Sequence, residues 1–213
     1  MNRKALILLK TLTWIACLSP FLWLGWCAVA NTLGPDPTAT ITFTTGSATL
    51  YILLSSLAVT PVRRLSRRLG WLIKFRRLLG LFAFFYGSLH LLTWMGLYCG
   101  FQPGAMLADV VKRRYVTAGM AAWALMLPLA ATSTGWAIRK MGSKSWTRLH
   151  RLVYLAAIAG IVHYWWQVKP GVLKPLDATL LLAALLVARS VHVWLRRRRS
   201  AARGAASPAA VRG

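Results

Sequence analysis

Residues 79–94 read LGLFAFFYGSLHLLTW, an almost entirely apolar stretch that contains one histidine, His90. A run of this composition is typical of a helix that crosses a membrane, which needs about 20 apolar residues. An ionisable side chain inside such a helix is costly, so it is interpreted as functional by default. The stretch therefore predicts a membrane-spanning helix that carries a functional imidazole.

Similar apolar runs continue through the chain. Hydrophobic residues make up 57% of its 213 residues and only three residues are acidic, which is far from the composition of a soluble domain. We therefore predict an all-α membrane bundle of six transmembrane helices, at residues 11–30, 45–62, 78–98, 118–138, 149–167 and 176–195. Pro128 is expected to kink the fourth of these helices. The apolar run before Ala28-Val29-Ala30 is longer than a typical signal-peptide core, so we expect the first helix to stay uncleaved.

The net charge of +24 is distributed unevenly along the chain. Most basic residues lie before the first helix, between helices two and three, between helices four and five, and after helix six. The intervening loops hold few of them and contain all three acids. Because Lys and Arg concentrate on the cytoplasmic side of a membrane, both termini are expected to be cytoplasmic. Orientation in a lipid membrane explains the charge, and the pattern of a nucleic-acid-binding surface is absent.

The predicted organisation has three parts. Residues 1–10 form a cytoplasmic N-terminus, residues 11–195 form the bundle, and residues 196–213 form a basic, disordered cytoplasmic tail. The sequence has no nucleotide-binding motif or soluble catalytic domain, and no Cys-x-x-Cys-His motif for covalent haem attachment. Any chemistry must therefore take place inside the bundle or at its faces.

Two histidines are predicted to lie at the same depth on two helices that run in the same direction. At 1.5 Å per residue, His90 lies about 18 Å along the third helix and His163 about 21 Å along the fifth. Two neutral imidazoles on opposite sides of an iron give a six-coordinate haem suited to electron transfer. No third or fourth ligand for zinc or copper is in reach, and we find no intramembrane carboxylate for a proton relay. His90 and His163 are therefore the candidate haem ligands.

Small residues accompany both histidines. Gly87 and Gly160 each lie three residues before a histidine and hence on the same helix face. They are expected to leave room for a flat macrocycle. The alternative is that these glycines only allow close packing of helices.

The other two histidines are less clear from sequence alone. His150 is expected at the cytoplasmic start of the fifth helix, about 20 Å from His163. It could ligate a second haem or contact another cofactor. However, the matching positions of the third helix hold Arg76 and Arg77, and a second ligand would have to be His192. We interpret His192 as an interfacial residue.

Several segments together resemble a known family. They are SPFLWLGW (19–26), RRLLGLFAFFYGSLHLLTW (76–94), KRRYVTAGMAAWALMLPLAATS (112–133) and MGSKSWTRLHRLVYLAAIAGIVHYWW (141–166). They are similar to the haem-binding membrane subunits of the bacterial periplasmic methionine-sulfoxide reductase system, the MsrQ or YedZ family of the ferric-reductase-like transmembrane superfamily.

This resemblance implies a specific function. It implies that the chain carries haem b and FMN and passes electrons across the bacterial inner membrane to the periplasmic molybdopterin enzyme MsrP. One haem is expected, and two are possible. By matching motif, the family histidines are His90, His150 and His163. Where the family often has Arg-Pro-Tyr, this chain has Arg113-Arg114-Tyr115, and the lost proline leaves the role of Arg114 open.

The electron donor and the remaining contacts are expectations with alternatives. The sequence shows no dehydrogenase domain, so the donor is expected to be a cytosolic flavin reductase or membrane quinol. The FMN phosphate needs cationic partners, which would be Arg76, Arg77, Arg148 and Arg151 unless these serve only orientation. Arg113 is expected to pair with a haem propionate, or else to dock the periplasmic partner. The rival functions are a quinol-oxidising cytochrome b for another partner and a non-redox membrane anchor or transporter.

Overall fold

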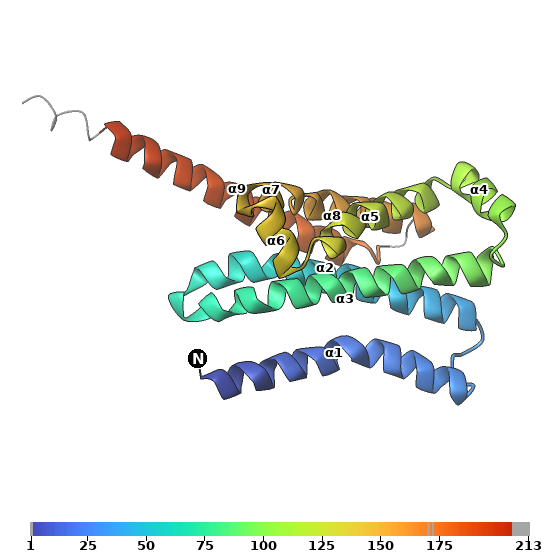
Figure 1. The fold of residues 1–213 in the computed structure, drawn as a ribbon. Helices are drawn as coiled ribbons and strands as arrows, with labels where there is room; N and C mark the ends of the chain where they lie inside the picture. Colours follow the sequence, from blue (N-terminus) through green and yellow to red (C-terminus); the bar gives the residue numbers. More distant parts are fainter. Residues whose placement is uncertain (1, 170, 172, 206–213) are drawn as a thin grey trace, which may run out of the picture.

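The computed structural model describes residues 2–205 except 170 and 172, with side chains as far as residue 201. Helices form nearly all of this part of the chain, and no strand occurs in it (Figure 1). The helices are α1 (Arg3–Val29), α2 (Pro37–Leu65), η1 (Arg67–Leu72), α3 (Ile73–Thr93), η2 (Trp94–Tyr98), α4 (Pro103–Lys112), α5 (Arg114–Ala131), α6 (Gly135–Met141), α7 (Ser143–Leu149), α8 (Leu152–Gln167) and α9 (Leu176–Ala205). The prediction of an all-α bundle is confirmed.

The long helices run back and forth along one direction (Figure 1). The α2–α3 connection, the start of α1 and the far end of α9 lie at one end of the bundle. The α1–α2 connection, α4 and the α8–α9 connection lie at the other end. We call these the basic end and the α4 end. The basic-rich segments of the sequence therefore share one end, as the charge pattern predicted.

Helix α2 occupies the centre of the bundle. It begins sharply because the Asp36 side chain accepts the backbone N–H of Ala39 and Pro37 occupies the first turn. Four of its leucines are buried in a cluster with residues of α3, α5, α8 and α9. The cluster comprises Leu50, Leu53, Leu54, Leu57, Ala83, Met126, Ala156, Ala157, Ile161, Ala178 and Leu182. The many alanines let these helices approach closely, which is how helices associate inside lipid.

Helix α1 is bound to α3 through a buried tyrosine. The hydroxyl of Tyr86, which extends from α3, makes two hydrogen bonds to the backbone of α1. It accepts from the N–H of Phe21 at 3.1 Å and donates to the carbonyl of Cys17 at 2.6 Å. Phe21 and Cys17 are four residues apart, so the hydroxyl is inserted into an intrahelical hydrogen bond. Pro20 lies beside this position and already interrupts the backbone ladder.

The number of spans differs from the prediction. In the part of the chain that the structure describes, four helices are long and apolar enough to cross a membrane, in the ranges Arg3–Val29, Pro37–Leu65, Arg67–Tyr98 and Leu176–Ala201. The pair formed by α5 and α6 would be a fifth, but the two are bent by 89°. The expected helix at 149–167 is represented by α8, whose 16 residues fall short of the roughly 20 needed for a straight crossing. Six spans are therefore not established by length and composition.

The break between α5 and α6 is sharper than the kink expected at Pro128. The hydroxyls of Thr132 and Ser133 donate to the carbonyls of Pro128 and Leu129, each at 2.6 Å. The side chain of Thr134 then accepts the N–H of Ala137 and starts α6 in a new direction. The three hydroxyl residues 132–134 thus mark the end of α5, which continues three residues past Pro128, and the start of α6.

Three further features were not expected from the sequence. Helix α4 forms in the loop after α3, and α7 precedes α8, so His150 lies between two helices rather than inside one. Helix α9 continues to Ala205, well into the segment expected to be a disordered tail. The rest of that expected tail, 206–213, lies outside the described residues.

Candidate functional site

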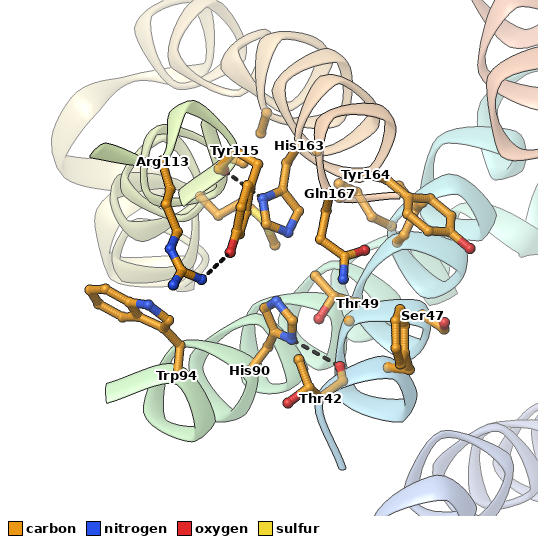
Figure 2. Close-up of a pocket in the computed structure, with 18 of the residues that line it drawn as sticks. Thr42, Ser47, Thr49, His90, Trp94, Arg113, Tyr115, His163, Tyr164 and Gln167 are labelled. Atoms are coloured by element: carbon orange, nitrogen blue, oxygen red, sulfur yellow. Dashed lines mark hydrogen bonds between the residues drawn. The ribbon is translucent and has the colours of Figure 1, made fainter. Parts of the chain in front are cut away.

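The two histidines at matched depth face each other across one cavity. His90 extends from α3 and His163 from α8, and their ring centroids are 5.9 Å apart with the planes at 84° (Figure 2). Bonds from imidazole nitrogen to a metal are about 2 Å long, so this separation is of the order that one metal between two imidazoles requires. We call this space the outer cavity, because it extends towards the α4 end of the bundle.

Backbone carbonyls hold both rings by the same nitrogen. His90 Nδ1 lies 3.1 Å from the carbonyl oxygen of Thr42, and His163 Nδ1 lies 2.7 Å from that of Tyr115. A carbonyl can only accept, so each Nδ1 carries the proton and donates it. The Nε2 lone pairs are then the ones free to bind a metal, as in most metal-ligating histidines. Thr45 Oγ1 also lies 3.3 Å from His90 Nδ1.

The outer cavity is narrow in this structure. Its volume is about 210 Å³, below the roughly 300–1,000 Å³ of common ligand pockets. Gly160 and Ala156 line it, as does Tyr164 at the edge shown in Figure 2. A macrocycle would enter only if neighbouring side chains separated, so the small residues around the rings matter most.

The glycines that touch the rings are not the ones expected from the sequence. A Cβ atom on Gly119 would lie 2.8 Å from His163 Nδ1, and one on Gly46 would lie 3.0 Å from His90 Cε1. Gly87 instead faces Thr49 of α2, where a Cβ would meet the threonine methyl at 3.4 Å. Gly160 lines the cavity, and a Cβ there would lie 3.9 Å from the nearest atom, a Leu50 methyl.

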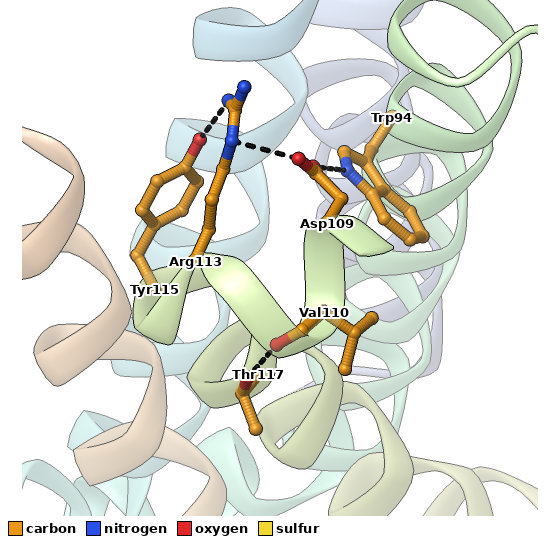
Figure 3. A network of polar contacts seen from close by, with 6 residues as sticks. All are labelled: Trp94, Asp109, Val110, Arg113, Tyr115 and Thr117. Carbon is orange, nitrogen blue, oxygen red and sulfur yellow. Dashed lines mark hydrogen bonds and ion pairs between the residues drawn. The ribbon is translucent and has the colours of Figure 1, made fainter. Parts of the chain in front are cut away.

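Arg113 lies at the mouth of the outer cavity and is already paired. Its Nε is 2.8 Å from Asp109 Oδ1, and its Nη1 donates to the Tyr115 hydroxyl at 2.8 Å (Figure 3). The second oxygen of Asp109 accepts the indole N–H of Trp94 at 2.9 Å. All four residues line the cavity. The sequence offered no sign of this network beyond the rarity of acids.

A second cavity, the inner cavity, contains the third histidine. His150 lines it together with Arg76 and Arg77, and its volume is about 270 Å³. The His150 ring stacks on Trp146 with centroids 3.8 Å apart, and its Nδ1 lies 3.1 Å from the Trp146 carbonyl. Burial, with a smaller effect of the Arg76 cation, lowers the pKa of His150 below its ordinary value.

One atom in the inner cavity lacks a partner. His150 Nε2 is buried and has no hydrogen bond within the part of the chain that the structure describes. A buried polar atom of this kind is costly unless a ligand or water satisfies it. Of the other expected flavin contacts, Arg148 and Arg151 are exposed and do not line the cavity. His192 lies on α9 outside both cavities.

The ligand set matches a metal that takes two protein ligands. Among the described residues, no group of three or more His, Cys, Asp or Glu side chains could hold a metal ion. A metal between His90 and His163 would therefore complete its coordination from a non-protein ligand, as haem iron does.

Comparison with known proteins gives a family match and a set of similar relatives. Residues 40–161 match the model of the ferric reductase like transmembrane component. Relatives named protein-methionine-sulfoxide reductase heme-binding subunit MsrQ include that of Ralstonia nicotianae, 42% identical over 191 residues, which are 90% of this chain and 87% of the relative. That of Rhodospirillum rubrum is 47% identical over 188 residues, 87% of this chain and 88% of the relative. That of Bordetella pertussis is 43% identical over 205 residues, 95% of this chain and 98% of the relative.

The chain belongs to the MsrQ family. The resemblance inferred from its motifs is thereby confirmed. The matched region 40–161 runs from α2 into α8 and contains His90 and His150, and the MsrQ relatives are similar over most of the chain.

Proposed function

We propose that this protein is a haem b-binding electron-transfer subunit of a methionine-sulfoxide reductase system. Two kinds of support agree: membership of the MsrQ family, whose relatives are named heme-binding subunits, and the geometry of the outer cavity. The single observation that carries the proposal is the facing pair of imidazoles, 5.9 Å apart, with both Nδ1 atoms held by backbone carbonyls.

His90 and His163 are the residues that would hold the haem iron. Haem iron held by two imidazoles exchanges single electrons and has no open position for oxygen. The protein keeps both imidazoles in the tautomer with a free Nε2, because the carbonyls of Thr42 and Tyr115 each accept a hydrogen bond from Nδ1–H. Gly46 and Gly119 let neighbouring helices approach these rings without displacing them.

The inner cavity is the proposed place for a second cofactor. An unpartnered His150 Nε2, the indole of Trp146 and two arginines surround it. Arg76 and Arg77 suit an anionic group such as the FMN phosphate, and the stacked aromatic pair suits a flat ring. A second haem with His150 as one ligand is the alternative. Arg148 and Arg151 do not line this cavity and have less support as flavin contacts.

The proposed orientation gives the electrons a direction. We place the basic end in the cytoplasm and the α4 end in the periplasm of the bacterial inner membrane, with both termini cytoplasmic and six crossings if α8 and the bent α5–α6 pair each count as one. Electrons from a cytosolic flavin reductase or quinol would pass the inner cavity, then the outer cavity, and reach MsrP. Reduction of one methionine sulfoxide there consumes two electrons and two protons and releases water.

The test is the haem content and absorbance spectrum of purified His90→Ala and His163→Ala, with His192→Ala as the matched control. We expect each of the first two variants to lose the main six-coordinate, low-spin haem, because one axial ligand is gone. His192→Ala should keep it, since its ring lies outside both cavities. Normal six-coordinate haem in either cavity variant would refute the pairing, and a colourless wild-type protein expressed with ample haem would refute the function.

A further inference from the structure

A continuous line of polar contacts crosses the mouth of the outer cavity. It begins at Trp94, one helical turn after His90. The backbone N–H of Trp94 donates to the His90 carbonyl. It continues through Asp109 and Arg113 to the Tyr115 hydroxyl, with steps of 2.9, 2.8 and 2.8 Å (Figure 3). The carbonyl of the same Tyr115 then accepts from His163 Nδ1 at 2.7 Å. The helices that carry the two histidines are thus linked across the cavity.

Asp109 is the branching point of this line. One carboxylate oxygen accepts from Trp94 and the other pairs with Arg113, so a single side chain connects both halves. Its side chain is 18% exposed, whereas that of Arg113 is 54% exposed. An exposed ion pair contributes little to stability by itself. This pair matters because it connects Trp94, which follows His90, to Tyr115, whose carbonyl accepts from His163.

The helix geometry around Trp94 agrees with a functional role. Residues 94–98 form a π-helical turn directly after α3. Such turns are rare and occur frequently at functional sites. This turn follows His90 closely and directs the indole of Trp94 towards α4.

The charges of the pair balance each other beside the proposed metal. Among the residues that line the outer cavity, one is acidic, Asp109, and one is an arginine or lysine, Arg113. Charges interact more strongly where water is partly excluded, as it is at Asp109, whose side chain is 18% exposed. Removal of either partner would leave the other uncompensated next to the centre.

We infer that Asp109 is a positioning residue for the centre held by His90 and His163. Its contacts with Trp94 and Arg113 fix the segments that carry His90 and contact His163, at the mouth of the outer cavity. Its negative charge also offsets the positive charge of Arg113 near the proposed metal. The inference rests on the proposed haem function and adds to it a residue that touches neither histidine in the hydrogen bonds found.

The charge role is tested by the midpoint potential of the bound haem in Asp109→Asn and Arg113→Gln. Asp109→Asn leaves a positive charge uncompensated, which disfavours the ferric form and should raise the potential. Arg113→Gln leaves a negative charge and should lower it. A purely structural role would not produce opposite shifts. Asp36→Asn is the matched control, because it removes a carboxylate at the same end of the bundle while asparagine still caps α2.

The positioning role is tested by electron paramagnetic resonance of the oxidised haem, whose g values depend on the angle between the two imidazole planes. Trp94→Phe removes the indole N–H without altering charge, so it should shift the g values and leave the potential nearly unchanged. Asp109→Asn should shift both, and Asp109→Glu should restore the potential in part.

The outcomes separate this inference from the proposed function. A wild-type protein without low-spin haem would refute the proposed function. Wild-type haem together with g values and potentials that match Asp36→Asn in all the variants would overturn the inference alone. Shifts of potential in the same direction for Asp109→Asn and Arg113→Gln would also overturn it. If Asp109→Asn fails to insert, Trp94→Phe and Arg113→Gln still decide the result.

Discussion

The outer and inner cavities hold histidines in different ways. In the outer cavity, two imidazoles face each other, and each is fixed by a carbonyl from a different helical segment. In the inner cavity, His150 is alone, and its Nδ1 faces a carbonyl of its own segment, Trp146. Two arginines and an indole surround it instead of a second imidazole. The first arrangement favours a metal with two axial ligands, and the second favours a flat, anionic ligand beside one imidazole.

The largest effect that would sharpen this comparison is expected from Gly119→Ala. The new Cβ would lie 2.8 Å from His163 Nδ1, so the ring must move and lose its bond to the Tyr115 carbonyl. Loss of such an outer-shell partner weakens metal binding by about 10–100-fold. We expect haem to dissociate faster by a similar factor, measured as transfer to an excess of apomyoglobin.

Gly160→Ala provides the control for this experiment. It also adds a methyl group at the outer cavity, but the nearest atom lies at 3.9 Å, an ordinary contact distance. Haem retention close to wild type is expected. Equal losses in both variants would mean that volume alone, rather than the position of His163, controls binding.

The sequence was sufficient for the central pair and insufficient for its surroundings. Depth along two parallel helices depends only on residue spacing, which is why His90 and His163 could be matched. Which residue of a third helix touches a ring depends on helix packing register, which spacing within one helix does not report. The glycines at Gly46 and Gly119 were therefore missed in favour of Gly87 and Gly160, which share a helix with each histidine.

The same reasoning explains the other differences in the fold. Hydropathy identified where apolar helices occur, but not that residues 132–134 would redirect the chain by hydroxyl-to-carbonyl bonds. It also placed His150 inside a span, although the helix begins only at Leu152. Asp109 was noted only as an acid on the basic-poor side, because its partners Trp94 and Arg113 become neighbours through α4.

A second way to break the comparison is His150→Ala. If the two cavities bind separate groups, this change should remove most of the inner cofactor and leave the outer haem spectrum unchanged. The physical reason is that only the inner cavity loses its imidazole. Flavin and haem should both be quantified per protein. Loss of the low-spin outer haem in this variant would show that the cavities do not act independently.

The smallest effect is expected from neutralising single arginines at the basic end. Arg77 and Arg151 are both exposed, but Arg77 lines the inner cavity and Arg151, which directly follows His150 in the sequence, does not. Cationic contacts to phosphate are charge-assisted and stronger than neutral hydrogen bonds. Arg77→Gln should therefore lower bound FMN several-fold, and Arg151→Gln should leave it unchanged.

Both changes remove one positive charge from the same end, so insertion and orientation are affected equally and the difference reports direct contact. Arg77 is also exposed, so added salt should reproduce part of the Arg77→Gln loss by screening its charge. Equal flavin content in wild type and both variants would remove the arginines from the site, and the inner cavity would then be better assigned to a second haem.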